Sequence, residues 1–248
     1  MAIRLPINGD RHKPGPEIAP GFLSAVPTLA KALAPPPPNS KTTHRRLQFA
    51  KWITNARNPL TARVLVNRLW QHHFGQALVR TPNNFGYKSD PPTHPMLLDW
   101  LAAEFMEPTT GGGAPWTLKR LHKLIMMSDT YQQQSVHPQA AEYAQRDFLN
   151  RNLWKFNRHR LNSESLRDAM LAVSGQMNLK MGGPSFYPKM SSEALEGLSR
   201  KAGDWKDSPT DERSRRSIYM MTKRSRLLPL MTVFDFSDTT ASLSLIHI

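Results

Sequence analysis

Apolar residues recur at intervals of three and four over the middle of the chain, which is the spacing of a helix with one buried face. The clearest example begins at Asn58-Pro59, because Asn can cap free N–H groups and Pro fits the first helical turn. Gly75 occupies the position where a left-handed residue ends a helix. The stripe between these signals consists of Leu60, Val64, Asn67, Trp70 and Phe74. The pattern therefore predicts a helix between Asn58 and Gly75.

The same periodicity predicts five further helices and a mainly α fold. They are a helix through Leu47, Ala50 and Ile53, a helix that Thr93 caps, with Leu101 and Phe105 on its buried stripe, a helix from Thr117 through Leu121 and Ile125 to Tyr131, a helix around residues 148–156, and a helix from Asn162 or Ser163 to Gly175. Weaker patterns predict extended segments at 78–80 and 217–222 and a helical segment at 227–234.

The two ends of the chain are less regular than its middle. Pro and Gly are frequent before residue 40, and the four consecutive prolines at 35–38 favour a stiff polyproline II spacer. We expect an extended arm and Pro-rich linker at 1–39, a multi-helix domain at 40–180, an irregular and incomplete C-terminal part of the same domain at 181–241, and a non-native tail at 242–248. We also expect the chain to be a fragment, cut at both ends, of a longer protein.

Composition narrows the classes of protein that this chain can be. Hydrophobic residues make up 39% of its 248 residues and charged residues 21%, a mixture typical of globular proteins. Because there is no cysteine, disulfide scaffolds, thiolate zinc sites and cysteine nucleophiles are excluded. No apolar run approaches the roughly 20 residues that a membrane-spanning helix needs, so we expect no membrane span.

The charge balance is strongly basic and has two interpretations. Lys and Arg total 33 against 19 Asp and Glu, which gives a formal net charge of +14. No acidic residue lies between Glu17 and Asp90, whereas that window contains Lys41, Arg45, Arg46, Lys51, Arg57, Arg63, Arg68, Arg80 and Lys88. One interpretation is binding of nucleic acid or another anionic polymer through its phosphates or other charges. The alternative is a solvated surface, or a face that covers an acidic partner domain.

Polar residues on the first predicted stripe form one candidate site. Arg63, Asn67 and Arg68 lie within one and a half turns, and Asn67 interrupts an otherwise apolar face. They predict either an internal hydrogen-bond network that fixes the next helix or a polar cluster that faces a ligand cleft. His94 stands at the start of another predicted helix, where it can bind an anion or make a capping contact.

A second candidate cluster consists of Arg158, Arg160, Glu164, Arg167 and Asp168. Glu164 and Asp168 are one turn apart, so they predict ion pairs within the domain or, as a sharper hypothesis, a pair of carboxylates for acid–base catalysis. A hydrolase or redox-linked enzyme that uses His94, Glu164 or Asp168 is the corresponding enzyme hypothesis, although no known catalytic motif is present. Among the nine histidines, adjacent His72 and His73 point about 100° apart and no pair has i, i+4 spacing, which predicts no metal site.

Longer motifs follow one another along the chain. They are Asn58-Pro59-Leu60-Thr61-Ala62-Arg63-Val64, Val66-Asn67-Arg68-Leu69-Trp70-Gln71, His73-Phe74-Gly75, Pro92-Thr93-His94-Pro95, Leu97-Leu98-Asp99-Trp100-Leu101-Ala102, Leu121-His122, Arg160-Leu161, Leu166-Arg167-Asp168 and Gly182-Gly183-Pro184-Ser185. With shorter pieces they cover roughly residues 5 to 238, and their order resembles the C-terminal domain of unknown function 1553 found in planctomycete cytochrome-c-associated surface proteins.

This resemblance implies an exported parent protein, located in the periplasm or on the cell surface. It implies two partners in the same parent chain, an upstream haem c module and a second helical domain, so haem c belongs to that module and no cofactor to this chain. The implied role is a binding or scaffold domain next to a haem c electron-transfer or polysaccharide-handling apparatus. The chain departs from the family pattern at Asn84, where the family usually has Asp, and at Ser89, where it usually has Gly.

Overall fold

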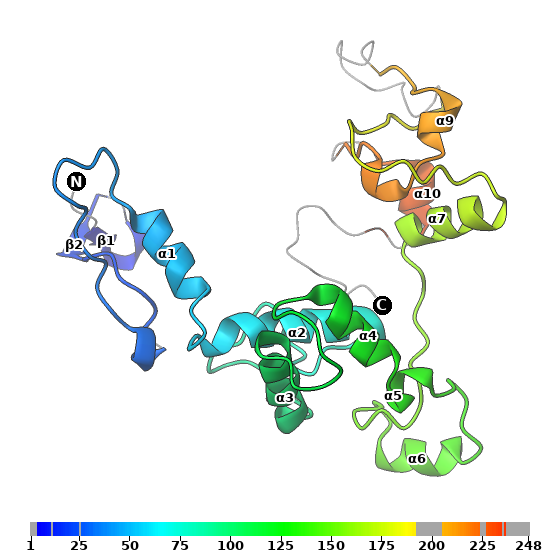
Figure 1. Ribbon diagram of the computed structural model, residues 1–248, viewed down its shortest axis with the longest axis horizontal. Coiled ribbons are helices and arrows are strands. Elements are labelled where there is room, and N and C mark those ends of the chain that lie inside the picture. Colours follow the sequence, from blue (N-terminus) through cyan, green and yellow to red (C-terminus); the bar gives the residue numbers. More distant parts are fainter. Residues whose placement is uncertain are drawn as a thin grey trace. The chain divides into compact units, whose positions relative to one another are not determined.

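The structure, a computed structural model, describes residues 4–10, 12–24, 26–191, 205–223, 227–234 and 236. The chain divides into two compact units, Met1–Asn157 and Arg158–Ile248. Helices dominate the described residues, and their named strands form one small antiparallel pair, so the mainly α prediction is confirmed (Figure 1). The predicted domain boundaries stay predictions, and the expected tail at 242–248 lies outside the described residues.

The first unit begins with short elements and continues with helices. Its elements, where η denotes a 3-10 helix, are β1 (Arg4–Pro6), η1 (Ile7–Gly9), β2 (Pro14–Glu17), η2 (Pro27–Leu29), α1 (Arg45–Ile53), α2 (Pro59–Phe74), α3 (Pro95–Met106), α4 (Leu118–Met126), α5 (Asp129–Gln132) and α6 (Ala140–Arg146). Strands β1 and β2 pair Arg4 with Glu17 and Pro6 with Pro14. The described residues before 45 contain no α-helix, which agrees with their Pro and Gly content.

Helix α2 begins and ends at the predicted residues. The Asn58 side chain accepts a hydrogen bond from the N–H of Leu60 at 3.0 Å and donates one to the carbonyl of Trp52 at 3.2 Å. At the other end Gly75 adopts a φ of 79° and its N–H donates to the carbonyl of Gln71 at 2.8 Å. A left-handed φ suits Gly because it has no Cβ. Local sequence signals therefore define both ends of this helix.

The core of the first unit forms around α2, which packs against α3 and α4 (Figure 1). Its buried apolar residues are Ala62, Val66, Trp70, Phe74, Leu78, Val79, Leu98, Leu101, Ala102, Phe105, Leu121 and Ile125. The rings of Trp70 and Phe74 stack with their centres 4.2 Å apart. Because α2 contacts both neighbours, its polar side chains are held in defined positions.

The segment at 148–156 is a loop, so the predicted helix there is wrong. The Asp147 carboxylate accepts the N–H groups of Arg151 at 2.9 Å and Asn152 at 2.7 Å, and Asn150 has a φ of 49°. Asp and Asn side chains that bind nearby backbone groups compete with helical hydrogen bonds. The regular helix of this region is α6, which ends just before the loop.

The helix predicted after Thr93 is confirmed as α3, but Thr93 does not cap it. The N–H of Thr93 donates to the carbonyl of Leu78 at 2.9 Å, so this residue joins two parts of a loop. His94 occupies the N-cap position, and its side chain makes no capping hydrogen bond. Residues 78–80 form bends rather than the predicted extended segment, because side chains and loop residues, not a neighbouring strand, supply their partners.

The predicted helix from Thr117 to Tyr131 is interrupted. Helix α4 ends at Met126, and the Ser128 side chain starts α5 by accepting the N–H of Tyr131 at 3.3 Å. The same hydroxyl donates to the carbonyl of Ile125 at 2.6 Å. A single serine therefore separates two helices whose apolar spacing looks continuous.

The second unit contains α7 (Ser163–Val173), α9 (Thr210–Arg213), η4 (Ser217–Tyr219) and α10 (Pro229–Val233). The Asn162 side chain caps α7 as predicted, and α10 confirms the helical segment at 227–234. The predicted extended segment at 217–222 is wrong over its first half, where η4 forms. Met220, which follows η4, forms a parallel bridge with Phe186, and both are buried with Met231 in a small core.

Candidate functional site

A surface hollow of about 460 Å³ lies between α2, the loop after it and the start of α3. Its apolar lining comes from Pro59, Leu60, Val79, Phe85, Pro91, Pro92, Pro95 and Leu98. Four polar residues, Arg63, Ser89, Asp90 and Asp99, complete the lining. A concave apolar surface of a few hundred Å³ with a small number of polar groups is the usual composition of a ligand site.

Arg63 is the predicted site residue that lines this hollow. Its Nε donates to Oδ1 of Asp99 at 2.7 Å, and its Nη1 donates to the carbonyl of Pro59 at 2.8 Å. The side chains of Arg63 and Asp99 are 34% and 58% exposed, so the ion pair is accessible to solvent. An exposed pair contributes only up to about 1 kcal/mol to stability. Because the pair is exposed and weak, a polar ligand can reach the charged groups of both Arg63 and Asp99.

Asn67 holds the wall of the hollow from inside. Its side chain is fully buried, its Nδ2 donates to the carbonyl of Val79 at 3.0 Å, and the N–H of Val79 donates back to its Oδ1 at 2.8 Å. The Asn67 amide thus makes the two hydrogen bonds that a neighbouring strand would make, and it pairs both the N–H and the carbonyl of Val79. Because Val79 lines the hollow, Asn67 positions the loop rather than a ligand.

Arg68 contacts the same loop from the next position on α2. Its Nη2 donates to Oδ1 of Asn83 at 3.3 Å, while its Nε is buried without a hydrogen-bond partner. The structure thus brings Arg63, Asn67 and Arg68 together around one loop. Arg63 faces the hollow, and the other two support the backbone that forms it.

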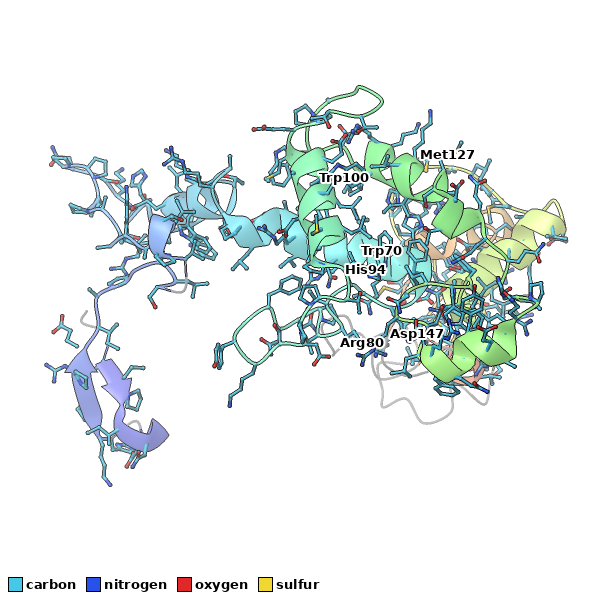
Figure 2. The ribbon with its side chains drawn as sticks, turned by 90° about the horizontal axis from the view of Figure 1, so that it is seen from below. Trp70, Arg80, His94, Trp100, Met127 and Asp147 are labelled. Carbon is cyan, nitrogen blue, oxygen red and sulfur yellow. The ribbon has the colours of Figure 1, made fainter. Side chains whose placement is uncertain are left out.

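His94 lies at the start of α3, beside the hollow rather than in its lining. Its Nδ1 is 3.0 Å from the hydroxyl of Thr93. Figure 2 shows His94 at the beginning of α3 and Trp100 further along the same helix, with Trp70 on α2. Trp100 is 45% exposed, whereas Trp70 is buried.

In the second unit, Arg167 joins α7 to a distant segment of the chain. Its Nη1 donates to the carbonyl of Arg215 and to the hydroxyl of Ser217, each at 3.0 Å, and its Nη2 donates to the carbonyl of Arg213. Burial lowers the pKa of Arg167, and the nearby Asp168 carboxylate opposes this change. The guanidinium therefore supports the backbone of residues that follow it by 46 to 50 positions.

Asp168 also binds this segment. Its Oδ1 accepts the N–H of Ser217 at 2.7 Å and lies 3.5 Å from Nη1 of Arg167. Its Oδ2 lies 3.9 Å from Nε of Arg216. Both carboxylate oxygens thus have nearby partners on the protein. The geometry supports a positioning role for Asp168.

The remaining members of the second cluster lie at or before the start of α7. Glu164 is half-buried and accepts a hydrogen bond from the hydroxyl of Ser163 at 3.0 Å. Arg158 and Arg160 are exposed in a segment without regular secondary structure. The hypothesis that Glu164 and Asp168 act as a catalytic pair stays a prediction.

A buried ion pair between α3 and α4 was not singled out from the sequence. Glu104 is 2% exposed, accepts the hydroxyl of Thr109 at 2.6 Å and the N–H of Thr110 at 2.7 Å, and pairs with Arg120. The Thr109 hydroxyl is the main cause that lowers the pKa of Glu104 to about 2. Glu104 follows Leu101 by three positions, so its place on the apolar stripe was the available signal.

Arg215 is a second buried charge that sequence reasoning missed. Its side chain is fully buried, pairs with Glu212 at 2.9 Å and donates to the carbonyl of Pro184 at 3.1 Å. The guanidinium also lies 4.1 Å from the ring centre of Tyr219. Hydrogen bonds from Lys180 and then from Arg215 lower the pKa of Glu212. Arg215 stands in a basic run, where no local pattern distinguishes a buried arginine from exposed ones.

A pair of histidines is the third feature that sequence spacing did not reveal. Nε2 of His73 on α2 lies 2.8 Å from Nδ1 of His122 on α4. Burial, followed by the neighbouring His122 and His72, lowers the pKa of His73. Only the packing of two helices brings these residues together, so their sequence positions gave no signal.

The fold and the hollow define a mainly α protein with one candidate ligand surface in its first unit. Residues 45–244 match the family PSD1, described as protein of unknown function (DUF1553), and the chain belongs to this family. No curated protein and no solved structure is significantly similar to the chain. Within the part of the chain that the structure describes, no helix has both the length and the apolar character needed to span a bilayer.

Proposed function

We propose that this chain is a binding or scaffold domain of an exported planctomycete surface protein, next to a haem c electron-transfer or polysaccharide-handling apparatus. The resemblance of its motifs to cytochrome-c-associated proteins supports the location and the neighbouring modules. Because the chain has no cysteine, it cannot attach haem through thioether bonds, and the proposal assigns haem c to an upstream module of the parent protein.

The observation that carries the binding role is the hollow beside Arg63. Its prolines and Phe85 offer an apolar surface, while Arg63, Asp90 and Asp99 offer charged hydrogen-bonding groups. Sugar rings present both C–H faces and hydroxyl groups, so they match such a mixed surface. The candidate residues behind it, Asn67 and Arg68, are occupied with the loop and support the shape of the hollow.

The test fills the hollow without removing a stabilising contact. Ser89 is half-buried in the lining, whereas its neighbour Lys88 is exposed and lies outside the lining, so Ser89→Trp and Lys88→Trp form a matched pair. The full chain is titrated with a neutral glucan, with alginate and with carrageenan. We expect binding of at least one polymer, which Ser89→Trp weakens by about tenfold or more and Lys88→Trp leaves unchanged. No binding to any of the three, or equal binding by both variants, contradicts the proposal.

The location is tested separately by a long sequencing read through the source locus. An in-frame signal peptide and a Cys-x-x-Cys-His motif upstream agree with the proposed parent protein. A reading frame that lacks both removes the export and haem parts of the proposal and leaves the hollow to be judged by the binding experiment.

The second candidate function is binding of an anionic polymer through α1. Arg45, Arg46 and Lys51 on this helix are all exposed. The Trp52 ring stacks with those of Phe22 and Phe49, with centres 5.7 and 6.0 Å away and planes within 3° and 8° of parallel. Exposed cations beside stacked aromatic rings are typical of surfaces that bind charged polymers with stacking groups.

Variants of the two surfaces, combined with salt dependence, distinguish the two candidates. The chain is titrated with heparin and with single-stranded DNA between low and physiological salt, using the triple variant Arg45→Ala, Arg46→Ala, Lys51→Ala and the hollow variant Ser89→Trp. If α1 binds polyanions, affinity falls steeply with salt, and the triple variant reduces the slope by about two to three. An unchanged slope in the triple variant eliminates α1 as the binding surface.

A further inference from the structure

Two histidines from different helices meet in the first unit. His73 on α2 and His122 on α4 are 49 residues apart, and Nε2 of His73 lies 2.8 Å from Nδ1 of His122. The ring centres are 5.0 Å apart and the ring planes cross at 64°. Both side chains are half-buried, so the pair lies at the edge of the core rather than inside it.

The two rings are held by rigid surroundings. Phe74 and Leu121, the chain neighbours of the two histidines, are buried in the core that joins α2 to α4. The ring of Tyr131 stands edge-on to His73, with the centres 5.4 Å apart. Side chains whose backbones are fixed by packing lose little further freedom when they bind a common partner. The backbones that carry the two imidazoles are therefore held close together before any ligand arrives.

The separation of the two nitrogens is that of a hydrogen bond and is slightly shorter than the separation of two imidazole ligands on one metal ion. Imidazole nitrogen binds zinc and similar ions at about 2.0–2.1 Å, so two such ligands at angles of roughly 90–109° place their nitrogens about 2.9–3.4 Å apart. The observed 2.8 Å between His73 and His122 is close to the lower end of this range. In the absence of an ion, one nitrogen donates its hydrogen to the other. To bind one ion, that nitrogen loses its hydrogen and the two rings rotate by about 35–45°, so that both lone pairs meet at one point.

We propose that His73 and His122 together bind a divalent transition-metal ion of the copper, nickel or zinc type. Imidazole nitrogen suits these ions, whereas magnesium and calcium prefer oxygen ligands. No group of three or more His, Cys, Asp or Glu side chains that could hold a metal gathers in the described residues. The ion therefore has two described protein ligands, and water or an incoming ligand fills its other positions. This site is separate from the hollow and does not depend on the proposed function.

Copper provides the direct test, because its paramagnetic resonance spectrum reports the nitrogens bound to it. The full chain, without a polyhistidine tag, is titrated with Cu²⁺ alone. We expect nitrogen hyperfine coupling from two imidazoles, and at least about tenfold weaker binding in His73→Ala and His122→Ala. His72→Ala is the matched control, because His72 is the exposed neighbour of His73 on α2 and lies outside the pair. Equal affinity in all three variants overturns the proposal.

A second measurement uses the unmodified chain and so does not depend on how the variants fold. Zinc is added to chain labelled with ¹⁵N in its histidines, and the imidazole nitrogens are followed by nuclear magnetic resonance. We expect Nε2 of His73 and Nδ1 of His122 to shift together as the first equivalent of Zn²⁺ is added. If the nitrogen signals of other histidines shift at lower Zn²⁺ concentration, or if the signals of this pair do not shift, the proposed site is contradicted.

Discussion

Asn67 directs its entire amide to a single residue, Val79. The two hydrogen bonds, of 3.0 and 2.8 Å, are buried, so water cannot replace them when the side chain is removed. A polar residue on an apolar stripe is therefore explained by the loop that it supports. The same reasoning applies to Glu104, whose carboxylate accepts hydrogen bonds from the Thr109 hydroxyl and the Thr110 N–H in the loop after α3.

We expect Asn67→Ala to lower the free energy of unfolding of the first unit by about 2 to 4 kcal/mol, because two buried backbone groups lose their partners. Urea denaturation followed by tryptophan fluorescence measures the change. Asn83→Ala is the control: Asn83 is exposed and its Oδ1 accepts a hydrogen bond from Arg68 at 3.3 Å, and substitution of such an exposed side chain is expected to change stability by less than about 0.5 kcal/mol. Equal effects of the two substitutions would falsify the buried role of Asn67.

Glu104 predicts how stability depends on pH. Its folded pKa is about 2, below the ordinary value of 4.5, so the unfolded chain takes up the proton first as pH falls. Its contribution to stability is complete above pH 4.5 and is lost as pH falls toward about 2. We expect Glu104→Gln to reduce this acid-dependent loss, measured as the urea midpoint against pH. A variant with the same pH profile as the parent chain contradicts the assignment.

Among the helices, α2 has the most complete set of local signals. Asn58 caps its first turn and Gly75 ends it, and both were visible in the sequence because capping depends on a few adjacent residues. The loop at 148–156 shows the opposite case. The spacing of its apolar residues resembles that of a helix, but the Asp147 carboxylate binds the backbone N–H groups that a helix would use. The periodicity of apolar residues contains no information about this competition.

The cap of α2 can be separated into its two hydrogen bonds. Asn58→Ala removes both, and we expect a loss of about 1 to 2 kcal/mol in the free energy of unfolding. Asn58→Ser keeps an oxygen that can accept the N–H of Leu60 and loses the donor to Trp52. In thermal or urea denaturation we therefore expect the stability of the Ser variant to lie between those of the parent chain and the Ala variant. A larger loss for Ser than for Ala is incompatible with the cap as described.

At the scale of the whole molecule, several contacts that stabilise each unit join residues far apart in sequence. The positions of α2, α3 and α7 and the candidate residues Arg63, Asn67 and Arg68 could be predicted because capping and periodicity are local. The pairing of His73 with His122 and the burial of Arg215 could not, because each depends on segments that meet only after folding. The resemblance of the motifs identified the family, which adds no residue roles to these contacts.

Because the chain divides into two compact units, we expect a destabilising substitution in one unit to leave the stability of the other unchanged. Arg215→Ala leaves Glu212 without one cation and removes the donor to Pro184, and loss of one partner of a buried ion pair costs about 3 to 5 kcal/mol. Hydrogen exchange followed by mass spectrometry is expected to rise around α7 and η4 and to stay constant in α2 and α3. Arg216→Ala, at a 49% exposed side chain, is the control and is expected to change neither unit. Faster exchange in α2 refutes independent units.

The bonds from Arg167 to residues 46 to 50 positions later also determine when the second unit can form during synthesis. The ribosome synthesises a chain from the N-terminus to the C-terminus, so residues Met1–Asn157 emerge before Arg213 and Ser217, the partners of α7, have been made. Translation therefore delivers the first unit ready to fold, whereas α7 waits for roughly a fifth of the chain to emerge. A pause in translation shortly before residue 213 would leave a nascent protein with one folded unit and one helix without its partners.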